Sequence, residues 1–475
     1  MMVRIKLNNL KYRYDVYHMF KLFYELMKIE FVEHEYDFQV NIETDIISIT
    51  SKDNDFKIYK INSNEKFNDE IKRSVFKYFE ERTGKKLPWG ILIGIRPTKR
   101  VLDMMDKGKS EDEIINTLKE KFFTREDKAK LCVYIAKIEK EKVNKDPKTI
   151  SIYIGMPFCP TRCLYCSFTS NPINACKKVV IPYIEALCYE IEMIKKFIDE
   201  KKLNIECVYF GGGTPTSVNE EQFENIISRI YESFVKDRNV TEFNVECGRP
   251  DSITEVKLKS MKKYGVNRIS INPQTMNDDT LKTIGRVHTV QDVIDKFNLA
   301  RQVGFDNINM DIIVGLPNED LKHVENTYRE ILKLKPDSLT VHGMSVKRAS
   351  RLHEQLVTGT IKLRTQDELN KMYEKTSELA KALKIKPYYM YRQKNMVGNM
   401  ENIGYVLPSK EGIYNIEIIE EKQTIIALGA DAVTKVVFLD ENRIERFGNV
   451  KDVREYIKRI EEKVQKKIEL LGTLY

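Results

Sequence analysis

Apolar strand-like runs and helical stretches alternate from residue 151 to about residue 348, and this alternation constrains the fold more than any other feature of the sequence. The strand-like runs are SIYIGM, IECVYF, EFNVEC, RISIN, INMDIIV and SLTVHGM, and the helical stretches lie near 179–200, 219–236, 254–264, 289–303 and 320–334. Strands that alternate with helices predict a parallel sheet with helices outside it. Six alternations rather than eight predict an incomplete (β/α)6, TIM-like barrel, in which ligands bind at the C-terminal ends of the strands.

Three cysteines follow the first of these runs. Cys159, Cys163 and Cys166 have the spacing C-x3-C-x2-C, which brings three thiolates onto one loop. They leave one metal position open, because a structural zinc or a fully ligated cubane cluster needs a fourth protein ligand. An open iron of a [4Fe-4S] cluster is what S-adenosylmethionine requires in order to chelate iron through its amino and carboxylate groups. The alternative is a zinc site completed by Cys176, although structural zinc sites usually pair two short cysteine hooks across a longer gap.

The chain has 475 residues, which is too long for one ordinary hydrophobic core. We predict an α/β protein of three domains: an N-terminal α+β domain with a helical linker at 1–145, the barrel at 150–348 and a C-terminal α+β extension at 349–475. In the first domain, a helical pattern over 14–31 precedes three strand-like runs and an amphipathic helix that ends at Gly84.

Composition and charge indicate a cytoplasmic protein. No run approaches the ~18 apolar residues that would cross a bilayer, and the N-terminus does not have the apolar region of a secretory signal. Eight cysteines, three of them in one loop, fit a reducing compartment better than a disulfide framework. The net charge of +8 permits an anionic substrate or a weak nucleic-acid partner and establishes neither. We expect no nucleic-acid partner and no membrane insertion.

Polar residues fall at the ends of the predicted strands. The run GGGTPT at 211–216 lets the backbone approach a ligand closely and offers N–H groups to a carboxylate, although a glycine run is often only a turn. Glu246 ends the third strand, and Asp311 interrupts the otherwise apolar fifth strand. Buried carboxylates need a partner, so these two indicate either a ligand site or a structural pair. Gln274 follows the fourth strand, and Arg286 lies in the loop that comes next.

Two segments outside the barrel combine aromatic and cationic residues. The segment KLPWGILIGIRPTKR holds Trp89, which we interpret as a linker residue that packs on the next domain. The segment KPYYMYRQKN holds Tyr389, Tyr391, Arg392 and Lys394. This mixture suits a flat, anionic ligand, because arginine binds carboxylates with two bonds and aromatic rings stack. A tyrosine-rich edge strand is the alternative. The last run, VREYIKRIEEKVQKKIELLG, predicts one amphipathic helix.

The cysteine loop, with Tyr165 directly before the third cysteine, resembles that of the radical S-adenosylmethionine superfamily. The motifs GGGTPT, NRISINPQT, LKTIGRVHT and NMDIIVGLP, in this order, look like those of its oxygen-independent coproporphyrinogen III oxidase family. LPWGILIGIRPTK and PYYMYRQKNMVGN extend the resemblance to the HemZ-type subgroup and to nearly the whole chain. Two features differ from the family. Phe168 stands where the best-characterised oxidases have a further cysteine, and no histidine follows His353, whereas the related haem chaperones carry a histidine-bearing motif in that part.

The resemblance implies a radical S-adenosylmethionine oxidoreductase that decarboxylates coproporphyrinogen III to protoporphyrinogen IX in haem and porphyrin biosynthesis. It implies a [4Fe-4S] cluster and S-adenosylmethionine as cofactors, a tetrapyrrole substrate and a reducing electron donor such as flavodoxin or ferredoxin. A radical S-adenosylmethionine methyltransferase and a porphyrin- or haem-binding carrier without turnover are the alternatives. By this resemblance Cys159, Cys163 and Cys166 bind the cluster. The residues implied to contact S-adenosylmethionine are Tyr153, Tyr165, Gly212, Gly213, Thr214, Glu246, Gln274, Arg286, Asp311, Ser345 and Val433.

Overall fold

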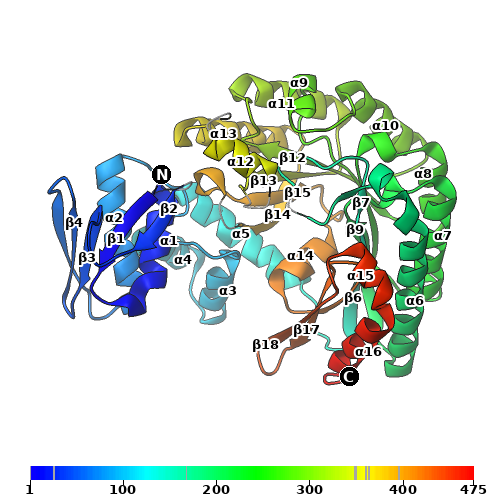
Figure 1. Cartoon of the computed structure of the whole chain (residues 1–475), viewed down its shortest axis with the longest axis horizontal. Helices are drawn as coiled ribbons and strands as arrows, with labels where there is room; N and C mark the ends of the chain where they lie inside the picture. The colour runs from blue at the N-terminus through cyan, green and yellow to red at the C-terminus, as the bar shows by residue number, and fades with distance from the viewer. Residues whose placement is uncertain are drawn as a thin grey trace. The chain divides into compact units, whose positions relative to one another are not determined.

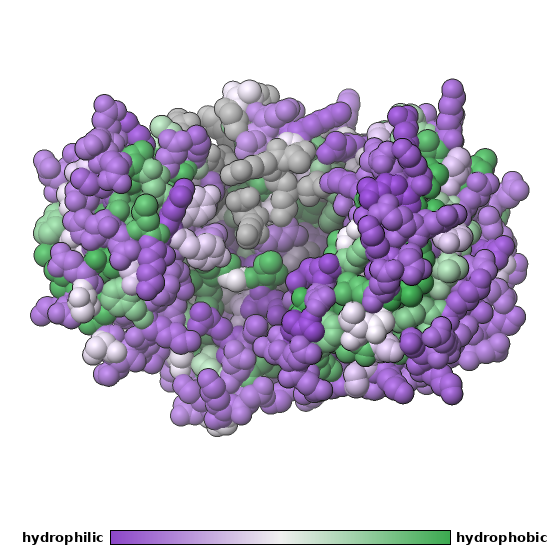
Figure 2. All heavy atoms as spheres, turned by 60° about the horizontal axis from the view of Figure 1, so that its bottom comes forward, coloured by the Kyte–Doolittle hydropathy of each residue, from purple (hydrophilic) through white to green (hydrophobic). Residues whose placement is uncertain are grey.

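The computed structural model describes residues 2–24, 27–166, 168–346, 350–358, 361, 364–393 and 396–475. The chain forms two compact units. The first comprises Met1–Ala136, Arg364–Leu369 and Tyr391–Glu401, and the second comprises Lys137–Leu363, Asn370–Met390 and Asn402–Tyr475. Across the described ranges no helix is both long enough and apolar enough to cross a membrane. On the face shown in Figure 2, hydrophilic residues cover most of the surface.

The first unit is built on a five-stranded sheet with helices α1 (Arg13–Phe23) and α2 (Phe67–Thr83) (Figure 1). The strands, in spatial order, are β2 (Lys28–Phe31), β1 (Met2–Leu7), β3 (Phe38–Ile42), β4 (Ile46–Ser51) and β5 (Phe56–Lys60). Every second residue of β1, β3 and β4 is buried, so one face of the sheet forms the core. In that core the ring of Phe79 on α2 lies 4.6 Å from the ring of Phe20 and 5.3 Å from that of Phe38.

The N-terminal elements agree with the sequence except in one place. Helix α2 ends at Gly84 in the left-handed conformation, φ 68°, as predicted. The helix predicted over 14–31 is shorter, because α1 ends at Phe23 and the residues of β2 form a strand instead. This strand pairs in parallel with β1 from Met2↔Lys28 to Ile5↔Phe31. Pairing with a strand that is distant in sequence outweighs the local helical pattern here.

Three helices follow in the linker: α3 (Thr98–Asp106), α4 (Glu111–Phe122) and α5 (Glu126–Lys142). Trp89 precedes them and is fully buried within the first unit. Its indole Nε1 donates to Glu401 at 2.7 Å, and the same carboxylate pairs with Lys128 of α5. Trp89 is therefore an anchor, but it packs inside its own unit.

The second unit contains the predicted parallel sheet. Its six central strands are β6 (Thr149–Met156), β9 (Asn204–Gly212), β10 (Glu242–Gly248), β11 (Arg268–Ile271), β12 (Ile308–Val314) and β13 (Ser338–Gly343), each parallel to the next. Figure 1 shows helices along the outer side of this sheet, and they are α6 (Lys177–Lys201), α7 (Glu220–Ile230), α8 (Glu255–Lys263), α9 (Asp278–Thr283), α10 (Val290–Gln302) and α11 (Leu321–Leu334). The predicted order of strands and helices is confirmed, and the described strands do not close into a barrel.

Segments from the C-terminal part of the chain extend both edges of this sheet. At one edge, β15 (Asn402–Val406) runs antiparallel to β13, and β14 (Lys386–Tyr391) lies outside it. At the other edge, β16 (Thr424–Leu428) pairs in parallel with β6, and β17 (Val433–Phe438) and β18 (Arg443–Gly448) follow. Residues 349–475, predicted to be a domain of their own, therefore add strands to both edges of the barrel sheet, and two of their segments, Arg364–Leu369 and Tyr391–Glu401, belong to the first unit. This region also contains the helices α12 (Arg351–Val357), α13 (Gln366–Ala382) and α14 (Ile413–Glu420).

The final helix differs from its prediction, because it is divided at Arg459 into α15 (Val453–Lys458) and α16 (Ile460–Leu471). Both parts contact α6, and both supply a partner to the buried carboxylate of Glu190. Tyr456 of α15 donates to Glu190 at 2.6 Å, and Lys467 of α16 forms an ion pair with it. A buried charge needs such compensation, and two short helices satisfy it here.

Glu417 on α14 is a buried acid with incomplete hydrogen bonding. The backbone N–H of Asn144 donates to its Oε1 at 2.8 Å, while its Oε2 has no hydrogen-bond partner among the described residues. Burial raises the pKa of Glu417 to about 8, and the bond from Asn144 offsets only part of that effect. The folded protein therefore favours the protonated form of this side chain.

We predict that Glu417→Gln stabilises the protein more at high pH than at low pH. The pKa is raised from the value of 4.5 in the unfolded chain, so the group's contribution to stability is complete below that value and is lost as the pH rises through about 8. In urea unfolding, the free energy of unfolding of the variant minus that of the wild type should grow by at most about 1.4 kcal/mol per pH unit over this window. The exposed Glu461→Gln serves as control, and a Glu417 difference that is independent of pH would contradict the argument.

Candidate functional site

The three cysteines lie on one loop after the C-terminal end of β6. Cys159 ends the short strand β7 (Phe158–Cys159), which pairs with β8 (Asn171–Pro172). The loop is fixed by backbone bonds, from Leu164 N to Ile284 O at 3.0 Å and from Cys166 N to Cys163 O at 3.1 Å. Cys159 is buried, whereas Cys163 and Cys166 are half-buried.

Each of the three sulfur atoms accepts a hydrogen bond from a polar side chain. Thr214 Oγ1 donates to Cys159 at 3.5 Å, and Ser170 Oγ donates to Cys166 at 3.6 Å. Arg249 Nη1 donates to Cys163 at 3.7 Å. Burial raises the pKa of Cys159 to about 12. The thiol therefore loses its proton when a positive centre such as iron binds the sulfur in its place.

The arrangement of the thiols fits a cluster better than a single ion. Among the described residues, no three His, Cys, Asp or Glu side chains are placed to hold one metal ion, with or without Cys176. A four-iron cluster does not require the sulfurs to meet at one point, because each thiolate binds a different iron. Three thiolates on one loop match such a cluster with one iron left open.

The glycines of 211–216 fit closely against the cysteine loop. A Cβ atom on Gly213 would lie 2.6 Å from Phe158 O and 2.9 Å from Cys159 Sγ, and one on Gly212, at φ 102°, would lie 2.8 Å from Met156 O. The N–H groups expected to face a ligand are used differently. Gly213 N donates to Met156 O at 2.6 Å and Thr214 N donates to Phe158 O at 2.8 Å, so both hold the cysteine loop in place.

Two carboxylates lie on the parallel strands, Glu246 near the C-terminal end of β10 and Asp311 at the centre of β12. Glu246 on β10 accepts a bond from Tyr209 Oη at 2.6 Å and one from Asn272 Nδ2 at 3.1 Å. Asp311 on β12 lies 3.4 Å from Nε2 of His342 on β13. Burial, aided by the charge of Asp311, raises the pKa of Glu246. Burial also acts to raise the pKa of Asp311, but the contact with His342 outweighs it and the pKa is lowered.

His342 was not among the predicted site residues. Its half-buried imidazole is close to Asp311, and this contact raises the pKa of His342 although burial opposes it. The signal was present in the sequence, since His342 is a polar residue at the end of the sixth strand, as Asp311 is in the fifth. The site therefore places Asp311, whose pKa is lowered, beside His342, whose pKa is raised, and Glu246 with its raised pKa lies near them.

Three buried polar atoms in this region lack a hydrogen-bond partner within the described part of the chain: Asn272 Oδ1, Gln274 Oε1 and Arg286 Nε. Arg286 is otherwise bonded to Asn272 O and, at 3.4 Å, to the hydroxyl of Tyr165. Buried polar atoms in folded proteins are almost always paired, so such a group indicates a polar ligand. These atoms fit a ligand that carries both hydrogen-bond donors and acceptors.

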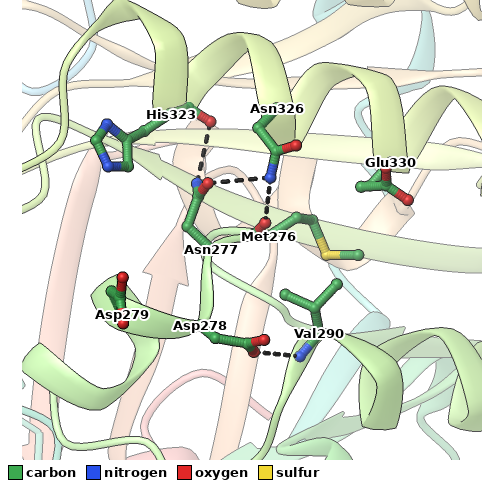
Figure 3. A pocket seen from close by; sticks show the side chains of 8 residues that line it. All are labelled: Met276, Asn277, Asp278, Asp279, Val290, His323, Asn326 and Glu330. Carbon is green, nitrogen blue, oxygen red and sulfur yellow. Dashed lines mark hydrogen bonds between the residues drawn. The ribbon is translucent and has the colours of Figure 1, made fainter.

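Gln274 is held in an unusual backbone conformation, φ 68°, by bonds from its N–H to Asp311 O and from Ile313 N to its own carbonyl, both 2.9 Å. The residues after it are fixed to α11. Asn277 Nδ2 donates to His323 O at 3.0 Å, and Asn326 Nδ2 donates to Met276 O at 2.7 Å (Figure 3).

The surface pocket drawn in Figure 3 is lined by Met276, Asn277, Asp278, Asp279, Val290, His323, Asn326 and Glu330, none of which was a predicted site residue.

The remaining predicted contacts are spread around the sheet. Tyr153 on β6 stacks on Tyr209, with ring centroids 6.0 Å apart and an interplanar angle of 17°. Ser345 follows β13 and is half-buried, and Val433, 45% exposed, begins β17. Tyr153 thus contacts Tyr209, which donates to Glu246. For Ser345 and Val433, only the position relative to β13 and β17 relates them to the predicted site.

The three residues predicted to contact the substrate have separate roles in the structure. Arg392, 5% exposed, belongs to the first unit, where its guanidinium donates to Leu92 O and Asn399 Oδ1 and lies 5.5 Å from the ring of Trp89. Tyr389 is buried on the edge strand β14, and Tyr391 is half-buried. With its donors engaged by the protein, Arg392 does not support the propionate-binding role. Lys394 lies outside the described residues.

Known proteins resemble this chain at the level of sequence and of fold. The profile of the Radical SAM superfamily matches residues 153–331. An oxygen-independent coproporphyrinogen-III oxidase-like protein, HemZ of Bacillus subtilis, is 41% identical over 403 residues, which are 83% of this chain and 79% of that protein. The haem chaperone HemW of the same organism is 37% identical over 224 residues, 47% of this chain and 58% of that protein.

Among solved structures, the coproporphyrinogen III oxidase HemN from Escherichia coli, described as a radical SAM enzyme, superposes with a TM-score of 0.53 at 20% identity. The match covers 69% of this chain and 73% of HemN, and it shows a shared fold. The superfamily match, the extent of the HemZ match and the cysteine loop after β6 agree with one another. The chain belongs to the HemZ-type subgroup of the oxygen-independent coproporphyrinogen III oxidase family, within the radical SAM superfamily.

Proposed function

We propose that the chain is a radical S-adenosylmethionine oxidoreductase that holds a [4Fe-4S] cluster through Cys159, Cys163 and Cys166. The observation that carries this proposal is the cysteine loop, in which each of three thiols accepts a hydrogen bond from the surrounding protein. Three thiolates leave one iron for the amino and carboxylate groups of S-adenosylmethionine. When bound, the reduced cluster and S-adenosylmethionine supply a 5′-deoxyadenosyl radical that abstracts hydrogen from a substrate carbon.

The polar atoms at the strand ends would bind S-adenosylmethionine. Gln274 Oε1 can accept from an ammonium or hydroxyl group, and Arg286 Nε can donate to a carboxylate. Asp311, kept ionised by His342, can accept from hydroxyl groups. The further contacts that we propose are Tyr153, Tyr165, Gly212, Gly213, Thr214, Glu246, Ser345 and Val433. The stacked rings of Tyr153, Tyr209 and Tyr414 would keep water from this part of the site.

For the substrate we propose coproporphyrinogen III, in line with the names of HemZ and HemN. Two of its propionates would each lose a hydrogen atom and CO2 to become vinyl groups, and one electron from each would pass to an acceptor. A flavodoxin or ferredoxin in the cytoplasm would reduce the cluster. Phe168, 71% exposed beside the cysteine loop, is the position at which this chain differs from the best-characterised oxidases.

A haem- or porphyrin-binding carrier is the second candidate, favoured by the 37% identity to the haem chaperone HemW. A carrier would retain the tetrapyrrole without consuming S-adenosylmethionine, whereas an oxidoreductase would release a changed product. A methylated product would instead indicate a methyltransferase.

The first test is anaerobic reconstitution followed by product analysis. The wild type should bind about four iron per chain, and Cys163→Ala should lose the cluster, whereas Cys176→Ala should keep it. With coproporphyrinogen III, S-adenosylmethionine, a reductant and an electron acceptor, the wild type should form 5′-deoxyadenosine and protoporphyrinogen IX. Stoichiometric retention of haem without 5′-deoxyadenosine would favour the carrier, and zinc in place of iron would refute the cluster.

Asp311→Ala tests the proposed cofactor site. The variant should bind S-adenosylmethionine more weakly by about 1–3 kcal/mol, because it removes an acceptor from a buried polar site, which corresponds to roughly 5- to 150-fold in Kd. Calorimetry on the cluster-loaded protein measures this difference. Asp306→Ala, an exposed acid shortly before β12, is the control, and an unchanged affinity in a folded Asp311 variant would assign the carboxylate a structural role.

Gly213→Ala tests whether the glycine turn supports the cysteine loop. The added methyl group would overlap Phe158 O and Cys159 Sγ, so we expect iron uptake to fall toward that of Cys163→Ala and stability to drop by about 1–3 kcal/mol. The matched control is Gly448→Ala on β18, where a Cβ would meet no atom within 4 Å. Full iron content in Gly213→Ala would show that the turn is not required.

A further inference from the structure

Arg249 follows β10 and is 3% exposed, although nothing in the proposed cofactor contacts accounts for it. Its Nε and Nη2 atoms each donate to the carboxylate of Asp251 at 2.9 Å, which is a bidentate pair. The remaining nitrogen, Nη1, lies 3.0 Å from Thr161 Oγ1 and 3.7 Å from Cys163 Sγ. A buried guanidinium thus points its last donor at one of the three sulfur atoms.

The surrounding residues fix this guanidinium in place. Asp251 lies on the turn after Arg249, and its carboxylate is also 3.4 Å from Nδ1 of the buried His288. Thr161, the second acceptor of Nη1, donates its own hydroxyl proton to Gly285 O at 2.8 Å. Because both partners of Arg249 are held by other segments, the side chain cannot leave the sulfur without breaking the bidentate pair.

The three sulfur atoms therefore have unequal partners. Cys159 and Cys166 accept hydrogen bonds from the neutral hydroxyl groups of Thr214 and Ser170, whereas Cys163 accepts one from the guanidinium of Arg249 and also interacts with that of Arg286. Hydrogen bonds to ligand sulfurs and nearby charge are among the main determinants of the reduction potential of an iron–sulfur cluster. Burial increases the effect of a charge, because the local dielectric constant is low.

We propose that Arg249 is a positioning residue that raises the reduction potential of the cluster through Cys163, and that Asp251 limits this effect. Reduction adds one electron to the cluster, which makes the ligand sulfurs better acceptors, so a fixed cationic donor stabilises the reduced state more than the oxidised state. Asp251 both orients the guanidinium and neutralises part of its charge. The inference rests on the proposed function only in that the three cysteines must hold a cluster.

The test is a redox titration of the reconstituted full-length protein, followed by electron paramagnetic resonance and carried out without substrate. Arg249→Gln removes the charge and withdraws the donor from the sulfur, so its midpoint potential should be more negative than that of the wild type. Asp251→Asn removes the countercharge, so its potential should be more positive. Opposite shifts distinguish an electrostatic role from general damage to the site, which would move both variants in the same direction.

The control is Arg268→Lys, since Arg268 is also buried but bonds to Asn307, Ser338 and the carbonyl of Lys410. Its potential should equal that of the wild type. An unchanged potential in cluster-loaded Arg249→Gln, or shifts of the same sign in both variants, would overturn the proposal. If Arg249→Gln takes up no iron, Asp251→Asn decides alone, and a potential at or below that of the wild type refutes it. A wild type without a cluster would instead refute the proposed function.

Discussion

Two backbone hydrogen bonds hold the candidate site together. They run from Gly213 N to Met156 O and from Thr214 N to Phe158 O, and they join the end of β9 to the start of the cysteine loop. The close approach is possible because glycine has no side chain, and the neighbouring Thr214 then has its hydroxyl within reach of Cys159. The geometry of the thiols thus depends on a contact between the first two strands of the sheet.

Three ionisable side chains inside the second unit each lie beside a partner of the opposite kind, an acid beside a base. Asp311 has His342, Arg249 has Asp251, and Glu190 has Lys467. Such pairing is required because an unpaired charge is costly to bury. The pair at Glu190 joins helices and has a structural role, whereas the other two lie on the parallel strands or directly after them. The buried atoms without a hydrogen-bond partner in this part of the sheet, such as Gln274 Oε1, are uncharged or belong to a side chain whose other atoms are bonded. The protein can therefore fold with these atoms unpaired before a ligand binds.

The sequence predicted the elements whose signal is local. The six parallel strands were predicted from apolar runs of strand length that alternate with helical stretches, and Glu246 and Asp311 were predicted as site residues because they interrupt such runs.

Features that depend on distant partners were not predictable. Arg392 bonds to Leu92, 300 residues earlier. The aromatic and cationic residues around Arg392 suggested a ligand site, whereas the fold uses the Arg392 side chain for packing. Likewise β2 becomes a strand through β1, and the two helices on either side of Arg459 each contact the distant Glu190. The sequence around Arg249 gave no indication that its side chain would meet Cys163, because 86 residues separate them.

The parallel pairing of β6 with β16 has a consequence for biosynthesis. Strand β6, which leads into the cysteine loop, finds one neighbour in β9 but the other only in Thr424–Leu428, with Ile150 opposite Thr424. During translation, most of the chain must leave the ribosome before β6 has both neighbours, and pairings of such high contact order form slowly. Until then the strand edge beside the three thiols is unpaired. Iron delivered to the nascent chain would meet a loop whose supporting strand is half assembled, so cluster insertion is best timed after the C-terminal strands have folded.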